Sequence, residues 1–566
     1  MAFIVKKEIG GKEYFYLRES RRENGKVKAV TLAYLGKTKK EAEIKKRKME
    51  NEAVAKKREE LKTEGNRLRV MSADNVESVR TGIGIDELAA FCRRKGFVFP
   101  SAEVYGGFSG FWDYGHLGAE LVRNIKSEWW NFHVRSREDV EGIDGAVITN
   151  PKVWDASGHI KNFVDYIVYD KKKMERFKID AHEIAEYEGK KDFVVEGKFN
   201  PMFETSVGPG GKKGEGAYLR PETAQSIFVN FKNVFESARM RLPCGIAQIG
   251  KAFRNEIAPR EFLFRTREFE QMELEYFIKP GQSCPFVDEI PDLEIAFYTA
   301  EMQASGKNAR KMKIKEALSN GFLGEWHAYW LAKEFEWFVL LGVNPENFRA
   351  RQHTEEEKSH YAVDTWDLEY KFPMGWRELQ GFANRGSYDL KQHQESSGKS
   401  FEIFDEASGK KIMPEVVCEP SLGVGRAFIV FLLEAYEFDR KRENVVLHLS
   451  PKLAPYKASV MPIVSKGEIE EAAYELFRGL KEEFNVFYDK SGSIGRRYAR
   501  QDEIGTPYCI AVDGDSLKDK SVTIRDRDST KQIRVYIKDL AKVLRDLLAD
   551  KVSFENAGKI VETRVK

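Results

Sequence analysis

The sequence predicts an α+β protein in which a large domain on a mixed or antiparallel sheet precedes a smaller α/β domain. The chain has 566 residues, more than one hydrophobic core usually serves, so we expect two to four domains. Residues 75–435 mix strand-like and helical runs without a repeating βαβ rhythm, which favours a mixed or antiparallel sheet with helices on it. From about residue 444, strand-like runs such as NVVLHLSP and PYCIAVD alternate with helical stretches, which is typical of an α/β domain.

Four segments are expected along the chain. Asn24-Gly25, between two strand-like runs, is a strong hairpin-turn signal. The Lys/Glu-rich stretch that follows predicts a helix, either a solvated linker or a basic arm that touches a polyanion. Trp326, Trp330 and Trp337 are expected to face the core of a helical insertion. The expected segments are a β-hairpin appendage at 1–36, a charged helical linker at 37–68, the large domain at 69–440 with the helical insertion at 281–345, and the α/β domain at 441–566.

Composition excludes few classes of protein. Lys and Arg number 93 against 90 for Asp and Glu, so bulk charge does not indicate a nucleic-acid binder, although local patches could bind phosphates. The five cysteines are scattered without a CxxC pair, which supports neither a zinc ribbon nor a disulfide framework. No apolar run is long enough to span a bilayer, and the first residues lack the apolar core of a signal peptide. We therefore expect a cytoplasmic protein without a membrane partner.

The segment GKAFRNEIAPREFLFRTREFEQMELEYF at 250–277 predicts a charged hairpin. Because side chains alternate along a strand, Phe269, Gln271, Glu273 and Glu275 share one face of the returning strand. A ladder of weak cross-strand ion pairs would explain the charges without any function. Polar groups spaced by two on one face also suit a binding site, and neighbouring motifs favour that interpretation.

The hairpin resembles motif 2 of the class II aminoacyl-tRNA synthetases, in which Arg-x-Glu, a variable loop and Arg-x-x-x-Phe follow one another. Here these are Arg254-Asn255-Glu256 and Arg265 to Phe269. Within that class the chain is most similar to the dimeric glycyl-tRNA synthetases. The resemblance implies an antiparallel sheet of six to seven strands in the catalytic domain and an anticodon-binding α/β domain at the C-terminus. The supporting stretches, in chain order, are YGGFSGFWDYGHLGAELVRNIKSEWW, VWDASGHIKNF, FNPMFETSVGPGG, AYLRPETAQSIFVNF, RELQGFANRGSYDL, CEPSLGVGRAF and GTPYCIAVD.

The resemblance implies an ATP site with arginine as its main catalytic group. Arginine suits phosphoryl chemistry because its planar fork pairs bidentately with phosphate or carboxylate. Arg254 would hold the α-phosphate and the attacking carboxylate, and Arg426 of GVGR would cover the adenine ring opposite Phe269. Glu378 would reach ATP through Mg²⁺. GVGR alone would suit a plain strand-to-helix turn. The implied ATP-binding residues are Arg254, Asn255, Glu256, Phe264, Arg265, Thr266, Arg267, Glu268, Phe269, Glu378, Leu379, Gly423, Val424, Gly425 and Arg426; the catalytic ones are Arg254 and Arg426.

The resemblance also implies a glycine pocket. Glycine offers an ammonium, a carboxylate and no side chain, so its site needs carboxylates for the ammonium and bulk where a side chain would lie. Arg220 could serve the substrate carboxylate. Glu222 alone would be explained by a carboxylate at a helix start. The implied glycine-binding residues are Glu222, Phe269, Glu270, Gln271, Met272, Glu273, Glu419, Pro420 and Ser421.

Further expectations concern partners. The resemblance implies tRNA(Gly), ATP and glycine as substrates, Mg²⁺ as cofactor, and a homodimer formed through the helix and strand that begin at residue 115. No zinc is expected, because 159–198 lacks cysteine, and Gln380 stands where the family has glutamate. Arg496, Arg497 and Arg500 would contact RNA or form a solvated helix face. The rival interpretations are a non-catalytic paralogue that binds nucleic acid and a synthetase for serine or alanine.

Overall fold

The computed structural model describes most of the chain. The described residues are 2–9, 12–23, 26–36, 38, 45, 83–179, 183–208, 215–358, 362–406 and 408–561. The chain divides into two compact units, Met1–Val79 and Arg80–Lys566.

The first unit contains a three-stranded antiparallel sheet in the order β1-β2-β3. Glu23 pairs with Lys26 across the expected turn, whose two residues lie outside the described ones. The expected charged helix at 37–68 also lies outside the described residues, apart from 38 and 45. The strands are β1 (Ala2–Ile9), β2 (Lys12–Glu23) and β3 (Lys26–Gly36).

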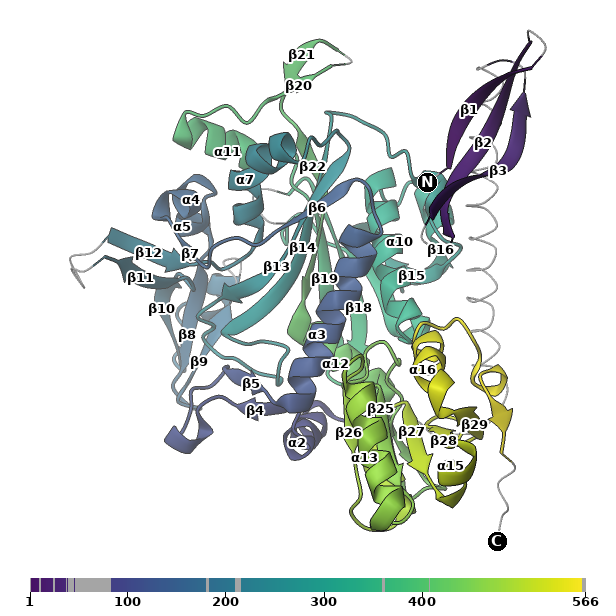
Figure 1. The fold of residues 1–566 in the computed structure, drawn as a ribbon. Helices are drawn as coiled ribbons and strands as arrows, with labels where there is room; N and C mark the ends of the chain where they lie inside the picture. The colour runs from purple at the N-terminus through teal and green to yellow at the C-terminus, as the bar shows by residue number, and fades with distance from the viewer. Residues whose placement is uncertain are drawn as a thin grey trace. The chain divides into compact units, whose positions relative to one another are not determined.

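A nine-stranded mixed sheet forms the centre of the second unit (Figure 1). Neighbouring strands are antiparallel except for the β13–β6 and β15–β17 pairs, which are parallel. The sequence predicted six to seven strands, whereas the sheet has nine. The difference arises because segment 281–345, which was expected to be helical, adds β15 and β16 at one edge. In sheet order the strands are β16 (Arg310–Lys313), β15 (Glu294–Tyr298), β17 (Phe348–Gln352), β18 (Asp364–Phe372), β19 (Gly375–Asn384), β22 (Glu415–Gly423), β14 (Glu268–Ile278), β13 (Cys244–Phe253) and β6 (Val140–Ile143).

Helices cover one face of this sheet with a continuous apolar core. Met272 and Leu274 of β14 point into it and are fully buried, together with Leu121 and Ile125 of the expected helix. Trp330 is fully buried in the same core, and Trp326 and Trp337 are nearly so, which confirms the core-facing prediction. The helices on this face are α2 (Ile85–Lys95), α3 (His116–Trp130), α10 (Glu325–Leu340) and α12 (Val424–Ala435).

The opposite face of the sheet is covered only in part. There α7 (Ala224–Ser237) and α11 (Tyr388–Ser397) pack on Ile246 and Phe277 in a second, smaller core. Farther along this face, toward Gly423, the side chains of β14 and β22 are polar. Because side chains alternate along a strand, β14 presents polar residues to this face and the apolar Met272 and Leu274 to the large core on the other face.

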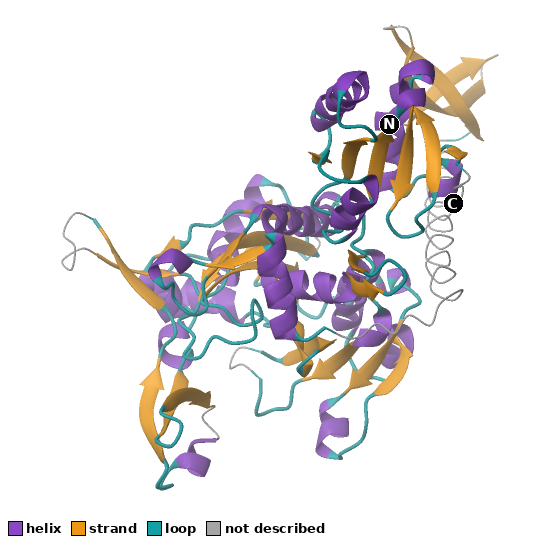
Figure 2. Cartoon of the chain, turned by 90° about the horizontal axis from the view of Figure 1, so that it is seen from below, coloured by secondary structure: helices purple, strands orange, loops and turns teal. Residues whose placement is uncertain are grey.

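Two small antiparallel sheets adjoin this face. The hairpin of β11 and β12 projects at the left of Figures 1 and 2. The strands are β8 (Asp165–Asp170), β9 (Glu175–Ile179) and β10 (Phe193–Phe199) in one sheet, and β7 (Ile148–Thr149), β11 (Phe203–Val207) and β12 (Glu215–Leu219) in the other.

The C-terminal part is the expected α/β domain. Its six-stranded sheet has the order β26-β25-β27-β28-β29-β30, parallel around β25 and antiparallel beyond β27, over its own apolar core. The elements are β25 (Ala458–Pro462), α13 (Gly467–Lys481), β26 (Val486–Tyr488), α14 (Ile494–Asp502), β27 (Tyr508–Val512), α15 (Gly514–Asp519), β28 (Ser521–Asp526), β29 (Gln532–Tyr536), α16 (Leu540–Leu548) and β30 (Lys559–Ile560).

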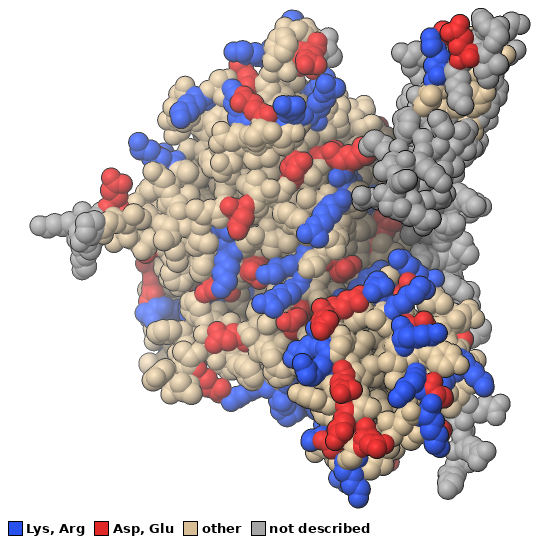
Figure 3. All heavy atoms as spheres, viewed as in Figure 1, with Lys and Arg blue, Asp and Glu red and all other residues tan. Residues whose placement is uncertain are grey.

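The surface agrees with the balanced composition. On the face drawn in Figure 3, Lys and Arg side chains are interspersed with Asp and Glu among larger areas of other residues. All five cysteines are buried and free. Within the described ranges, no helix is long and apolar enough to cross a membrane.

Candidate active site

Glu273 lies at the centre of a cluster of buried polar side chains, referred to below as the pocket, on the partly covered face of the sheet. Its register partners are Gln248 of β13 and Ser421 of β22, so the three side chains lie across adjacent strands. The Glu273 carboxyl accepts hydrogen bonds from Ser421 Oγ at 2.6 Å, from Gln271 Nε2 at 2.8 Å and from the backbone N–H and hydroxyl of Thr223. Burial and the neighbouring charge of Glu222 raise the pKa of Glu273.

Arg385 ties the carboxyls of the pocket together. It follows β19, is 1% exposed, and its guanidinium lies over the ring of Phe228. It donates to both oxygens of Glu419 at 3.1 Å and to both of Asp389 at 2.8 and 2.9 Å. Its Nη2 also lies 3.9 Å from Glu222 Oε1. The pKa of Glu419 is raised to about 8, mainly by burial. Arg385 lowers this pKa in part, and the neighbouring carboxylates Glu273 and Glu222 raise it further.

Glu222 closes the other side of the pocket from the segment just before α7. Its Oε2 lies 3.2 Å from His159 Nε2, and its Oε1 accepts from Gln225 Nε2 at 3.2 Å. Burial alone would raise its pKa, but the ion pairs with His159 and Arg385 outweigh burial and hold the pKa of Glu222 well below its usual range. Glu222 is therefore a carboxylate at neutral pH.

Arg254 lies where β13 ends, at the border of the pocket. Its Nε donates to the carbonyl oxygen of Pro221 at 2.9 Å. The guanidinium carbon lies 5.3 Å from the ring centre of Phe163 and 5.5 Å from that of Phe269. Two aromatic rings and one carbonyl thus fix the plane of the guanidinium. Its terminal nitrogens make no hydrogen bond to a described residue, so they are available to an anion.

Arg426 begins a second group of residues at the start of α12. Its Nη1 donates to the carbonyl oxygen of Glu378 at 2.9 Å and lies 3.1 Å from Glu378 Oε1, and its guanidinium stacks on Phe264 at 4.6 Å. This charge keeps the pKa of the half-exposed Glu378 below its usual value. A Cβ on Gly425 would lie 2.9 Å from the carbonyl oxygen of Leu263, so glycine lets the motif 2 loop approach α12.

The loop 254–267, which joins β13 to β14, is held mainly by side chains that donate hydrogen bonds to backbone carbonyl oxygens. Arg267 donates to the carbonyl oxygens of Glu256 and Ser109, and the Thr266 hydroxyl donates to that of Glu268. Arg265 remains half-exposed, 4.0 Å from Glu256 Oε2. Arg265 is therefore more available to a ligand than Arg267.

Several expected site residues point elsewhere. Glu270 pairs with Lys126 of α3, Met272 lies in the apolar core, and Glu268 pairs with Lys251. These three side chains lie on the sheet face opposite Glu273, because even-numbered residues of β14 point away from it. The side chains of Leu379 and Val424 are also in the core. None of these five side chains can contact a ligand in the pocket.

Two further expectations are corrected. Arg220 donates to the carbonyl oxygens of Lys251 and Gly145 and to Gln248, so it holds backbone rather than a substrate carboxylate. Arg497 is 2% exposed and donates to the carbonyl oxygen of Pro462, so it cannot contact RNA, whereas Arg496 and Arg500 are exposed.

Sequence reasoning missed Arg385, His159 and Thr223. Arg385 and Asp389 lie in a quoted motif at a spacing of four, the spacing of helical ion pairs, and that was the available signal. His159 and Thr223 carried no such signal, because their partners are distant in sequence or belong to another strand.

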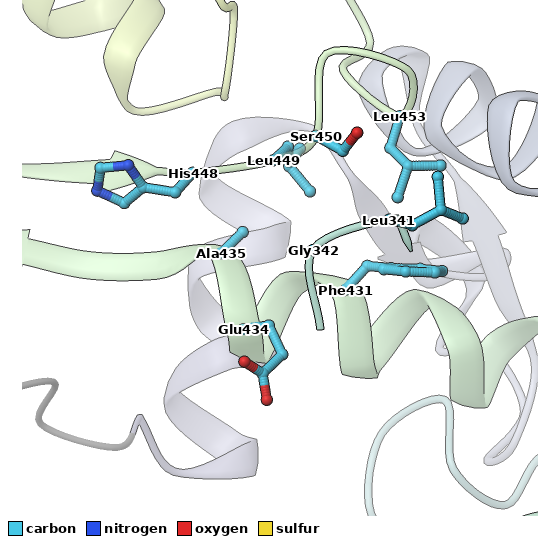
Figure 4. A pocket seen from close by; sticks show the side chains of 9 residues that line it. All are labelled: Leu341, Gly342, Phe431, Glu434, Ala435, His448, Leu449, Ser450 and Leu453. Carbon is cyan, nitrogen blue, oxygen red and sulfur yellow. The ribbon is translucent and has the colours of Figure 1, made fainter. Parts of the chain in front are cut away.

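A small cavity is lined by none of these residues (Figure 4). Its volume of about 10 Å³ is at the lower limit for one water molecule. It is too small for a substrate. Its lining residues are Leu341, Gly342, Phe431, Glu434, Ala435, His448, Leu449, Ser450 and Leu453.

The fold and the site together define a class II aminoacyl-tRNA synthetase. Residues 205–436 match the model of the tRNA synthetase class II core domain (G, H, P, S and T), and 457–547 match that of the anticodon binding domain. The fold is similar to that of prolyl-tRNA synthetase from Cryptosporidium parvum, with a TM-score of 0.51, 16% identity, and coverage of 82% of this chain and 77% of the other.

Relatives with higher sequence identity show which family within this class the chain belongs to. The chain is 42% identical to glycine–tRNA ligase of Borrelia hermsii over 473 residues, which cover 82% of this chain and 97% of the relative. It is 41% identical to glycine–tRNA ligase of Staphylococcus haemolyticus, with coverage of 83% and 99%, and 42% identical to that of Geobacillus thermodenitrificans, with coverage of 82% and 98%. The chain belongs to the glycine–tRNA ligase family.

Proposed function

We propose that the chain joins glycine to the 3′ end of tRNA(Gly), through a glycyl-adenylate formed from ATP. The observation that carries this proposal is the clustering of three buried carboxyls, Glu222, Glu273 and Glu419, whose charges act on one another. An ammonium group needs such carboxyls, and glycine brings no side chain that would require further space beside them.

In the first step, the glycine carboxylate attacks the α-phosphate of ATP and pyrophosphate leaves. Arg254 would neutralise charge on both reacting groups, because its charge acts on Glu222 and Glu273 while its Nε and ring contacts fix its orientation. Nothing in this step requires a protein nucleophile, so positioning and charge stabilisation supply the catalysis.

The ATP base and terminal phosphates would occupy the group around Arg426. Phe269 would stack on adenine and Glu256 would bind its amino group, with Arg265 at the terminal phosphates. Arg426 stacks on Phe264 in the free protein and would turn from this ring onto the nucleotide.

Glu378 is the residue that would hold Mg²⁺. Its ionised, half-exposed carboxylate suits a hard cation, and the described residues contain no cluster of three potential metal ligands. That combination fits Mg²⁺, which binds through one or two carboxylates together with substrate phosphates. When bound, the ion supplies charge neutralisation of the polyphosphate.

The second step transfers glycine to the terminal adenosine of the tRNA. The loop 257–264, with Pro259 and Arg260, would contact the acceptor end. Exposed Arg496 and Arg500 of the C-terminal domain would contact the anticodon arm. Residues 1–68 would assist in holding the tRNA. The protein would act in the cytoplasm.

A homodimer completes the proposal. β6 is an edge strand of the nine-stranded sheet, and Glu141 and Gly142 in it are exposed. An edge strand offers unpaired backbone groups to a second chain. Sedimentation of the full chain should give twice the monomer mass.

Amino-acid-dependent exchange of labelled pyrophosphate into ATP, without tRNA, tests the first step. We expect exchange with glycine alone among the twenty amino acids. Exchange with serine or alanine would keep the class and overturn the pocket assignment. A folded protein that exchanges with none would instead be the non-catalytic paralogue.

A further inference from the structure

Glu275 is a buried carboxyl that the proposed reaction does not use. It is completely inaccessible to solvent and lies two residues from Glu273 on the same face of β14. Neither of its oxygens has a hydrogen-bond partner among the described residues. A buried carboxylate without a donor or a cation is very unstable, so Glu275 is a neutral acid in the free protein.

The other carboxyls of the pocket each have a partner that stabilises negative charge. Glu419 and Asp389 pair with Arg385, and Glu222 pairs with His159. Glu273 accepts hydrogen bonds from neutral donors but has no described cation within ion-pair distance. Two of five carboxyls thus lack a cation, and a glycine ammonium would supply one.

The surroundings of Glu275 identify the charges that act on it. Burial is the main cause that raises the pKa of Glu275; Glu419 of β22, Glu273 and Asp389 of α11 raise it further, while Arg385 lowers it. From the remaining elements, β13 places Ile246 opposite Glu275, and α7 packs on that core with apolar residues. A positive charge placed between Glu273 and Glu419 would therefore act directly on Glu275.

We propose that glycine binding releases the Glu275 proton to solvent, so that the pocket exchanges one proton for the ammonium of its substrate. The O–H bond of Glu275 breaks, its electron pair stays on the carboxylate, and the bound ammonium compensates the new charge. The proton in the free protein relieves repulsion among five crowded carboxyls. Its departure adds a negative group near a cationic ligand, so a neutral analogue gains nothing from it. This inference rests on the glycine pocket proposed above.

Calorimetry in two buffers tests the exchange. The full-length protein is titrated at pH 7 with a non-hydrolysable glycyl-adenylate analogue, in phosphate and in Tris, which differ in ionisation enthalpy. We expect release of about one proton per site, seen as a buffer-dependent enthalpy. The matched analogue with a hydroxyl in place of the ammonium should release none. Equal enthalpies for the ammonium analogue in both buffers would overturn the proposal, whereas no binding at all would refute the glycine pocket itself.

The pH dependence gives a second readout. Because a proton leaves on binding, affinity rises with pH, and the dissociation constant should fall about tenfold per unit between pH 6 and 8. Glu275→Gln keeps the shape of a neutral acid but has no proton to release. This variant should release about one proton fewer per site than the wild type, and the pH dependence of its dissociation constant should be correspondingly weaker; release from Glu419, whose pKa is also raised, would remain. Glu395→Gln, on the exposed side of α11, should behave as the wild type. Full proton release by Glu275→Gln would contradict the assignment to Glu275.

Discussion

Replacing Glu273 with glutamine separates the charge of the pocket from its shape. The carboxyl accepts from Ser421, Gln271 and Thr223, so an amide at this position must replace one acceptor oxygen by a donor. The Oε1 atom of Gln271 has no hydrogen-bond partner among the described residues. Gln271 can therefore flip its amide and accept from the new NH₂, and the Ser421 hydroxyl can also turn to accept. We expect Glu273→Gln to fold with little loss of thermal stability.

The substitution should instead weaken the binding of glycine. A hydrogen bond to a charged partner contributes about 1.5–3 kcal/mol more than its absence, and about 1.4 kcal/mol is a factor of ten. Loss of one carboxylate–ammonium contact should therefore raise the KM for glycine by about 10- to 150-fold. The KM for ATP should stay within about twofold, since Glu273 does not face the Arg426 group.

Glycine-dependent pyrophosphate exchange measures both constants, and thermal unfolding checks the fold. A KM for glycine within threefold of the wild type would falsify the placement of the ammonium at Glu273. An equal rise in both constants would show that the substitution disturbs the whole sheet face. Glu273→Ala is the less informative variant, because it also leaves the Thr223 and Ser421 donors without an acceptor.

Three other outcomes are expected. Arg426→Lys loses the flat stacking group and the paired contacts with Glu378, so the KM for ATP should rise about tenfold in pyrophosphate exchange with little change for glycine; an unchanged value would remove Arg426 from the ATP site. Arg497→Ala should lower the melting temperature by several degrees, because the side chain is buried and bonded to backbone, whereas Arg496→Ala should leave melting unchanged and weaken tRNA binding; the reverse pattern would refute the burial argument. Deletion of 1–68 should raise the KM for tRNA without affecting pyrophosphate exchange, and an equal KM for tRNA would dismiss the proposed role of this segment.

The sequence predicted the site best where one strand carries it. The period of two along β14 put Phe269, Gln271 and Glu273 on one face, as the structure has them. The same period excludes Glu270 and Met272, which entered the expected site only because they are contiguous with it in the motif.

Other features could not be obtained from local patterns. β15 and β16 are short and lie in a Trp-rich helical segment; β16 pairs with β15, and β15 joins the sheet through β17, which lies far along the chain. Arg385 contacts Glu419 and Glu222, which lie 34 and 163 residues away in sequence. Such contacts join residues far apart in the sequence, so a local pattern cannot reveal them.

The position of Arg385 has a consequence for redesign of the pocket. The carboxyl groups of Glu419, Asp389 and Glu222 depend on one another, since all three pair with the same arginine, Arg385. Substitutions at these positions should therefore be strongly non-additive in double-mutant cycles. A pocket that admits a larger amino acid would need a coordinated replacement of the whole charged set, because removing one carboxyl changes the balance of charge around Arg385, which the other two share. The same coupling would keep amino-acid choice stable against single mutations during evolution.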